Sequence, residues 1–201
     1  ILLPFEERSY VTVNGESSNV FGRVRTDFGE GTHLGFVGTD RRYDGGGSGS
    51  VIGVDGRLRL DRNYQIEAQY LHGFTTEPDD TTLTEGINGE TFDGGKHTAD
   101  FDGETFDGGA IYASLERNGR HWGFDLDYWD VAPTFRAENG FEVRNSFREG
   151  IAQSTYLFRF DDSTWLAWLQ PGVSGSRRWN YEGIRKDTIL QAWLEGRFRF
   201  A

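Results

Sequence analysis

Apolar and polar residues alternate along most of this chain. From Trp122 to Tyr128 every second residue is aromatic or aliphatic, and glycine or aspartate stands between. Successive side chains of a β-strand point to opposite faces of the sheet, so a period of two predicts strands with one apolar and one polar face. The pattern predicts nine strands, at 19–28, 32–43, 50–61, 63–76, 108–117, 121–131, 145–160, 164–173 and 186–200, and a shorter tenth at 8–13.

The predicted connections alternate between short and long. The short ones include FGEGT and RNGR, and Asn118-Gly119 is typical of a hairpin turn. The long ones are 42–50, 77–107, 131–143 and 174–186. Long loops at one end and tight turns at the other are typical of outer-membrane barrels. We therefore predict an all-β, antiparallel, transmembrane outer-membrane β-barrel over 1–201, either complete or a fragment of a larger barrel, with 77–107 as a long acidic extracellular loop.

The two faces of the predicted strands suggest where lipid and water lie. In a membrane barrel the apolar face meets lipid and the charged face lines the lumen, whereas a soluble sheet buries its apolar face. Tyr64 and Tyr70 stand near opposite ends of one apolar face, as interfacial aromatic residues do. The lumen is then either a charged pore or an interior plugged by ion pairs. The residues predicted to line it are Arg23, Arg25, Asp55, Arg57, Arg59, Glu67, Glu116, Asp125, Asp127, Arg159, Glu195, Arg197 and Arg199.

Composition narrows the function classes. The net charge of −11 argues against a nucleic-acid partner, because the phosphate backbone would be repelled. The chain has no cysteine, which excludes disulfides and thiolate chemistry. It has no apolar run of 18 residues and no recognisable signal peptide, and it lacks methionine, which favours a processed protein or a fragment.

Most of the negative charge lies in one segment. Residues 77–107 hold ten acidic residues and one lysine, and the octapeptide NGETFDGG recurs there as DGETFDGG, fourteen residues later. The second copy overlaps a run of carboxylates with the ligand type of a calcium loop, formed by Asp100, Asp102, Glu104 and Asp107. The pattern lacks the closing glutamate of a complete calcium loop. The segment is therefore either a calcium site or a hydrated acidic loop, and no other cofactor is predicted.

Two other groups carry candidate chemistry. Asp125 and Asp127 share one face of a strand, so they are weak candidates for paired catalytic carboxylates or else ordinary lumen charges. Arg177, Arg178 and Trp179 fall in a predicted loop, where they would contact lipopolysaccharide phosphate or a glycan, or simply be solvated beside the membrane.

Two blocks, GSVIGVDGRLRLDRNYQIEAQYLHGFTTEP and GGAIYASLERNGRHWGFDLDYWDVAPTFRAENGFEVRNSFRE, resemble an uncharacterised bacterial outer-membrane β-barrel family. The matching features are VDGRLRL and the F-x-A-x-x-G-F-x-x-R run from Phe135 to Arg144, and the resemblance covers roughly residues 20–160. Members usually carry an N-terminal domain similar to family-9 carbohydrate-binding modules, which is missing from this chain. The resemblance implies an outer-membrane location and a link to glycan uptake.

We therefore expect a non-enzymatic outer-membrane pore or envelope scaffold, linked to glycan or solute uptake. Its partners would be outer-membrane lipid and lipopolysaccharide, with a glycan or other envelope proteins. Two alternatives stay open: an outer-membrane barrel hydrolase, and a soluble β-rich binding domain or subunit of a larger envelope assembly.

Overall fold

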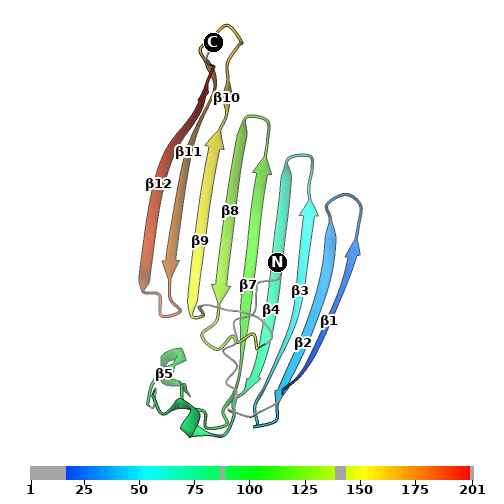
Figure 1. Cartoon of the computed structure of the whole chain (residues 1–201), viewed down its shortest axis with the longest axis vertical. Helices are drawn as coiled ribbons and strands as arrows, with labels where there is room; N and C mark the ends of the chain where they lie inside the picture. Colours follow the sequence, from blue (N-terminus) through cyan, green and yellow to red (C-terminus); the bar gives the residue numbers. More distant parts are fainter. Residues whose placement is uncertain (1–16, 87–88, 139–143, 200–201) are drawn as a thin grey trace.

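Nine long strands, each paired with the next along the chain, form one antiparallel sheet (Figure 1). The computed structural model describes residues 17–86, 89–138 and 144–199. The long strands are β1 (Ser17–Asp27), β2 (His33–Tyr43), β3 (Ser48–Arg59), β4 (Tyr64–Thr76), β7 (Thr105–Asn118), β8 (Trp122–Val131), β9 (Phe147–Tyr156), β11 (Leu166–Trp179) and β12 (Arg185–Phe198). A two-residue strand, β10 (Phe158–Arg159), adds to the end of β11.

The connection from β4 to β7 contains its own small elements. They are the 3-10 helices η1 (Thr81–Thr84) and η2 (Asp93–Gly95) and a hairpin of β5 (Thr91–Phe92) and β6 (His97–Thr98). Among the described residues, these short helices are the only ones, and none has the length and apolar character to cross a membrane.

The all-β antiparallel prediction is confirmed, and each of the nine predicted strands has a counterpart in the structure. The predicted strand 145–160 is wrong as a single element, since it divides into β9 and β10. The predicted strand 164–173 is too short, because β11 continues to Trp179. The tenth prediction, 8–13, lies outside the described residues.

Two of the predicted long loops are hairpin turns. Between β2 and β3, Tyr43 N–H donates to the Gly47 carbonyl at 3.2 Å, and Gly46 and Gly47 supply the positive φ that this turn needs. Between β11 and β12, Asn180 N–H donates to the Ile184 carbonyl at 3.0 Å. The loop predictions failed because glycine and serine runs were interpreted as coil, although they pair across strands. The two long connections that remain, from β4 to β7 and from β8 to β9, begin and end at the same end of the sheet (Figure 1).

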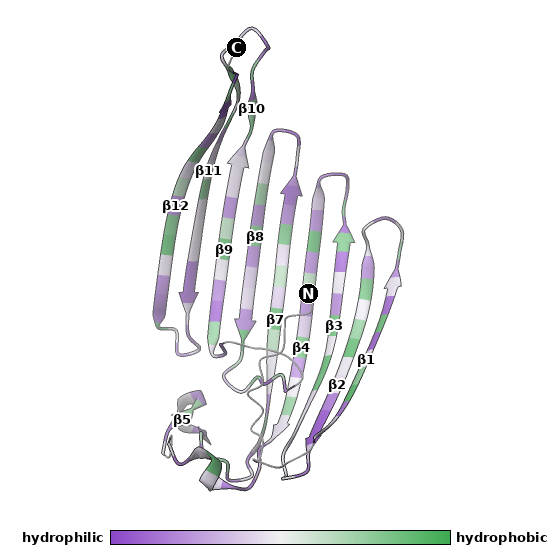
Figure 2. Ribbon diagram, in the orientation of Figure 1, coloured by the Kyte–Doolittle hydropathy of each residue, from purple (hydrophilic) through white to green (hydrophobic). Residues whose placement is uncertain are grey.

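The register gives the sheet two distinct faces. The strands are paired without a shift from β1 to β9, so side chains of one alternation share a face across the sheet. The apolar face carries Val24, Phe36, Leu58, Ile66 and Leu126, and Figure 2 shows green and purple positions alternating along the strands. The opposite, polar face carries Arg23, Asp55, Glu67, Glu116 and Asp127.

The sheet is open in the described part of the chain. β1 pairs only with β2, and β12 pairs only with β11, so two long edges carry unpaired backbone groups. The antiparallel sheet is thus observed, whereas closure into a barrel is not. The buried hydrophobic residues among those described are few: Val51, Phe101, Phe106, Val131 and Phe135.

This small core forms where a long connection folds onto the sheet. Phe135, 2% exposed, lies against Gly73 of β4 and Gly108 of β7, which stand opposite each other in the register. A Cβ on Gly108 would come within 2.5 Å of the Phe135 nitrogen, and one on Gly73 within 2.6 Å of the Arg136 carbonyl oxygen. The paired glycines therefore let residues 132–138 lie directly on the polar face.

Candidate functional site

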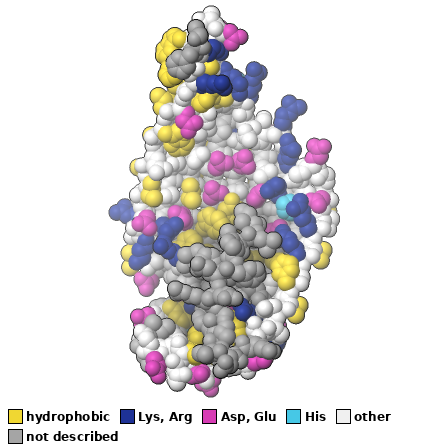
Figure 3. All heavy atoms as spheres, in the orientation of Figure 1, with side chains coloured by type: hydrophobic (Ala, Val, Ile, Leu, Met, Phe, Trp, Pro, Cys, Tyr) yellow, Lys and Arg dark blue, Asp and Glu magenta, His cyan; other side chains and the backbone are white. Residues whose placement is uncertain are grey.

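The polar face carries a network of ion pairs between strands. Arg23 donates two hydrogen bonds to the Asp55 carboxylate, at 2.7 and 2.8 Å, and His33 Nε2 lies 3.4 Å from the same group. Arg57 pairs with Glu67 on the adjacent strand. Figure 3 shows basic and acidic side chains interspersed over the side of the molecule that it displays. Charges of opposite sign therefore neutralise one another on this face instead of forming a field of one sign.

Asp55 is the shared acceptor of this network, so we expect Asp55→Ala to destabilise the protein. Its side chain is 12% exposed, and its loss leaves Arg23 without its counter-charge and His33 without its neighbouring carboxylate. The expected loss in the free energy of unfolding is about 1–3 kcal/mol. Equilibrium denaturation measures it. The matched control is Asp27→Ala, since Asp27 pairs with Arg25 on the same strand and is 60% exposed; its expected cost is below about 0.5 kcal/mol. Equal costs for the two variants would contradict this account.

The other predicted lumen residues fall into two groups: those at paired strand positions and those that bind the carbonyl groups of turns. Glu116 and Asp125 stand opposite each other in the register, and Glu195 and Arg197 occupy positions paired with Gln170 and Trp168. Arg159 belongs to β10, also opposite Trp168. Two arginines bind turns: Arg59 donates to the carbonyls of Asp61 and Arg62, and Arg199, beyond β12, donates to those of Asp161, Thr164 and Leu166. These two guanidinium groups fasten the short connections.

Asp125 and Asp127 share the polar face of β8 as predicted. The Tyr112 hydroxyl donates to Asp127 at 2.9 Å, and the residues opposite Asp125 are Glu116 and Gln153. The residues opposite Asp127 are Ser114 and Ile151. No histidine occupies these paired positions, and the carboxyl group that the register places opposite Asp125 is that of Glu116. Catalysis by this pair stays a prediction.

The doubled octapeptide brings its own two copies together. Phe92 of the first copy and Phe106 of the second occupy equivalent positions, and their rings meet edge to face with centroids 5.4 Å apart. The Arg136 guanidinium lies over both rings, at 5.0 and 5.4 Å from their centroids. The first copy forms β5 and the second begins β7. The duplication thus supplies both halves of an aromatic pair that joins the acidic loop to residues 132–138.

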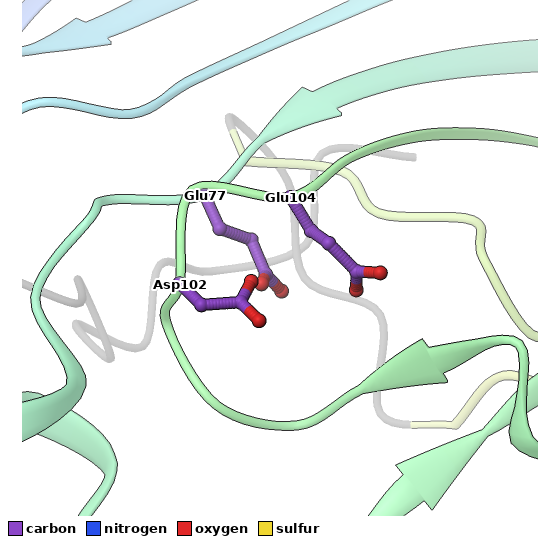
Figure 4. Close-up of side chains that lie close together, drawn as sticks. All are labelled: Glu77, Asp102 and Glu104. Atoms are coloured by element: carbon purple, nitrogen blue, oxygen red, sulfur yellow. The ribbon is translucent and has the colours of Figure 1, made fainter.

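An acidic cluster lies at the two ends of the connection between β4 and β7, which also contains Phe92. Carboxylate oxygens of Glu77, Asp102 and Glu104 all lie within 4.8 Å of one another. Figure 4 shows these side chains leaving two adjacent segments, the exit from β4 and the entry to β7, and extending to the same side. Glu77 N–H donates to the Glu104 carbonyl at 2.9 Å, which fixes the two segments together.

This cluster differs from the predicted calcium ligands. Asp102 and Glu104 belong to it, but Asp107 projects to the other face of β7, where His72 Nε2 lies 3.0 Å from its carboxylate. The alternation of β7 separates Asp107 from the cluster, and Asp100 is not among the three clustered carboxylates. Glu77 was missed because it lies 25 residues upstream of Asp102 and no local motif connects them.

Burial raises the pKa of Glu77 from 4.5 to about 7, and the neighbouring carboxylates Glu104, Asp102 and Glu138 add to the shift while Arg136 opposes it. Because the folded protein holds this proton more tightly than the unfolded chain, the stabilisation is complete below pH 4.5 and is lost as the pH rises through 7. Without divalent cations, we expect the free energy of unfolding to fall by about 1–3 kcal/mol over this interval.

Unfolding at a series of pH values in chelator measures this fall. In Glu77→Gln it should be much smaller, because the amide has no proton to lose. Glu85→Gln changes the charge of an exposed residue in the same connection and should keep the wild-type pH dependence. A Glu77→Gln profile as steep as that of the wild type would refute the assignment.

The predicted contact group Arg177, Arg178 and Trp179 is part of β11 and not of a loop. Arg178 donates to Glu149 at 2.6 Å. A second group near this end was not predicted: Arg148 pairs with Asp130 at 2.9 Å and lies over the ring of Tyr181. The Tyr181 hydroxyl donates to Asp130, and burial together with this bond raises the tyrosine pKa. A phosphate or glycan contact by Arg177 and Trp179 stays a prediction.

No family model matches the chain, and no curated protein matches it. The resemblance to an outer-membrane barrel family therefore stays a prediction from the quoted motifs.

Proposed function

We propose that this chain forms the wall of a transmembrane β-barrel in a bacterial outer membrane and serves there as a non-enzymatic envelope scaffold or pore. The observation that carries the proposal is the apolar face. Each of the nine long strands contributes to it at least one large hydrophobic side chain that is exposed, for example Val24, Phe36, Ile52, Tyr70, Ile111, Leu126, Tyr156, Val173 and Leu190.

Exposure of such an apolar face to water is unfavourable in free energy. Each Å² of apolar surface left in water forgoes roughly 25 cal/mol, so a soluble sheet of this size would cover the face with another layer. Among the described residues, the connections that pack on the sheet, such as 132–138, lie on the polar face instead. Lipid is the surrounding that makes the exposed apolar side favourable and leaves the ion-paired side for the interior.

Strand length and edges agree with this surrounding. The long strands have 10 to 14 residues, enough for tilted strands to cross the apolar layer of a membrane. In lipid every backbone group needs a partner, so the free edges of β1 and β12 would have to be paired, either in a larger barrel or with each other. The proposal therefore includes closure of these two edges in the membrane.

Two observations favour a scaffold with a filled interior over an open pore. The polar face neutralises its charges in pairs such as Arg23–Asp55 and Arg57–Glu67. Residues 132–138 lie on that same face and would occupy part of the lumen. Glycan uptake is supported only by the family resemblance, and a hydrolase finds no support in the surroundings of Asp125 and Asp127.

The experiment is refolding of the chain with and without lipid vesicles, followed by flotation and by quenching of tryptophan fluorescence with brominated lipids. We expect the protein to float with the vesicles and its fluorescence to be quenched. A monodisperse, folded protein in detergent-free buffer that does not float would overturn the proposal in favour of a soluble β domain. Planar-bilayer recording then separates the two roles: a filled scaffold gives no stable conductance, whereas a pore conducts with an ion selectivity that Arg57→Ala alters.

A further inference from the structure

Two buried polar atoms near the end of β4 have no hydrogen-bond partner. Thr75 Oγ1 and Glu77 Oε2 are inaccessible to solvent and unpaired in the described part of the chain, and the two residues are 6% and 9% exposed. Both residues line a cavity of about 20 Å³ together with Phe101, Arg136 and Glu138, and Glu77 is the one clustered carboxylate that borders it. A buried polar atom without a partner costs about 1–3 kcal/mol, so this arrangement favours a polar species bound beside Glu77.

We propose that Glu77, Asp102 and Glu104 bind a divalent cation, of which Ca²⁺ fits best, and that the cation joins the exit from β4 to the entry to β7. Their carboxylate oxygens lie within 4.8 Å of one another, close enough for a single ion to contact all three. This site does not depend on whether the sheet lies in a membrane.

Among the described residues, no arginine or lysine forms an ion pair with the three clustered carboxylates. Arg136 donates to the carbonyls of Pro133 and Phe135 and lies over Phe92 and Phe106, and it forms no ion pair within 4.0 Å with Glu77 in the described chain. His97 Nδ1 lies 3.5 Å from Glu104 Oε1. Three carboxylates gathered at this distance repel one another strongly unless a cation or protons compensate them.

The ligand chemistry selects among cations. Three carboxylates and no clustered imidazole or thiolate make an all-oxygen site, which suits hard cations. Asp102 is exposed, so water reaches the site and completes the coordination. The ligands come from irregular backbone, which accommodates the variable geometry of Ca²⁺ better than the strict octahedron of Mg²⁺. Thr98 N–H donates to Glu104 Oε2 at 3.1 Å and holds that carboxylate in place.

The ion would close the 77–104 connection at its base. Glu77 and Asp102 are 25 residues apart in the chain, and the segment between them carries η1, β5, η2 and β6. An ion that binds only the folded chain stabilises the closed connection by its binding free energy. The bound cation should therefore stabilise the connection between β4 and β7 and the contact between the Phe92 and Phe106 rings.

The test is calorimetric titration of the full folded chain with CaCl₂ in 0.15 M NaCl, with thermal unfolding in CaCl₂ and in EGTA. We expect one bound Ca²⁺ with a dissociation constant below about 1 mM, weaker Mg²⁺ binding, and a melting temperature several degrees higher in Ca²⁺. Asp102→Asn, a substitution of an exposed residue, should weaken Ca²⁺ binding at least tenfold. Glu77→Gln should abolish it while leaving the protein folded in EGTA. Glu85→Gln removes the same charge from an exposed position of the loop and should bind as the wild type does.

Three results would overturn the proposal. The first is an unchanged melting temperature in millimolar Ca²⁺, which would mean that only water occupies the cavity. The second is wild-type Ca²⁺ affinity in both Asp102→Asn and Glu77→Gln. The third is that Glu85→Gln weakens Ca²⁺ binding as much as these variants do, which would mean diffuse attraction to an acidic loop. If Glu77→Gln fails to fold, Asp102→Asn and terbium luminescence of the wild type still decide the matter. Vesicle flotation of these variants should be unchanged, so failure of this site is distinguishable from failure of the membrane proposal.

Discussion

Leu126→Arg should destabilise the protein in lipid vesicles by about 2–4 kcal/mol, the cost of an arginine facing the middle of a bilayer from a barrel strand. Leu126 lies in the middle of β8 on the apolar face, where it is 43% exposed and stands between Leu115 of β7 and Ala152 of β9. A charge placed there would meet hydrocarbon on one side and apolar neighbours on the other. Equilibrium unfolding in vesicles by denaturant measures the loss.

The matched control is Gln153→Arg on the neighbouring strand. Gln153 stands opposite Asp125, so an arginine there gains an acidic neighbour and lies on the polar face. We expect it to change the free energy of unfolding by less than about 1 kcal/mol. If Leu126→Arg is as well tolerated as Gln153→Arg, then the apolar face does not meet lipid, and the membrane proposal fails with it.

Phe135→Ala should lower the free energy of unfolding by about 3–5 kcal/mol, which is the range for truncating a buried phenylalanine. Phe135 is the largest side chain that is almost completely buried among the described residues, and it fills the space left by Gly73 and Gly108. Gly73 and Gly108 have no side chains that could fill the resulting cavity, so little structural relaxation should offset the lost stability. The variant should also free residues 132–138 from the polar face.

Equilibrium unfolding measures the loss for Phe135→Ala, and limited proteolysis of the folded variant reports on the freed connection. Phe28→Ala is the control, since Phe28 lies in the short turn between β1 and β2 and is 61% exposed. Its expected cost is below about 1 kcal/mol. Similar costs for both phenylalanines would show that residues 132–138 do not pack on the sheet as described.

Much of the fold could be predicted because the alternation of apolar and polar residues in a strand is visible within a few adjacent positions. The segment 121–131 predicts β8 almost to its ends, and 63–76 predicts β4 within one residue. The faces follow from the same alternation, which is why Arg23, Asp55 and Glu67 were placed together on one side. Residues 174–179 were missed because small and charged residues on a strand resemble a loop until their cross-strand partners are known.

The candidate site was predicted only in part. The acidic character of 77–107 is a matter of composition, and Asp102 and Glu104 were named from their local spacing. Local spacing also led to Asp107, which the alternation of β7 turns to the opposite face, where it meets His72. Whether Asp107 joins Asp102 and Glu104 or lies on the opposite face depends on where β7 begins. Sequence patterns locate the ends of strands poorly.

The sequence by itself determined the strands, their two faces and the concentration of charge in one connection, because these depend on neighbours within a few positions. The tertiary structure decided which residues meet across long separations: Asp55 with Arg23, Phe92 with Phe106, and Glu77 with Asp102 and Glu104. It also left the outer edges of β1 and β12 unpaired within the described residues. Such choices depend on pairing register and loop closure, which join distant parts of the chain and have no signature in any short stretch of it.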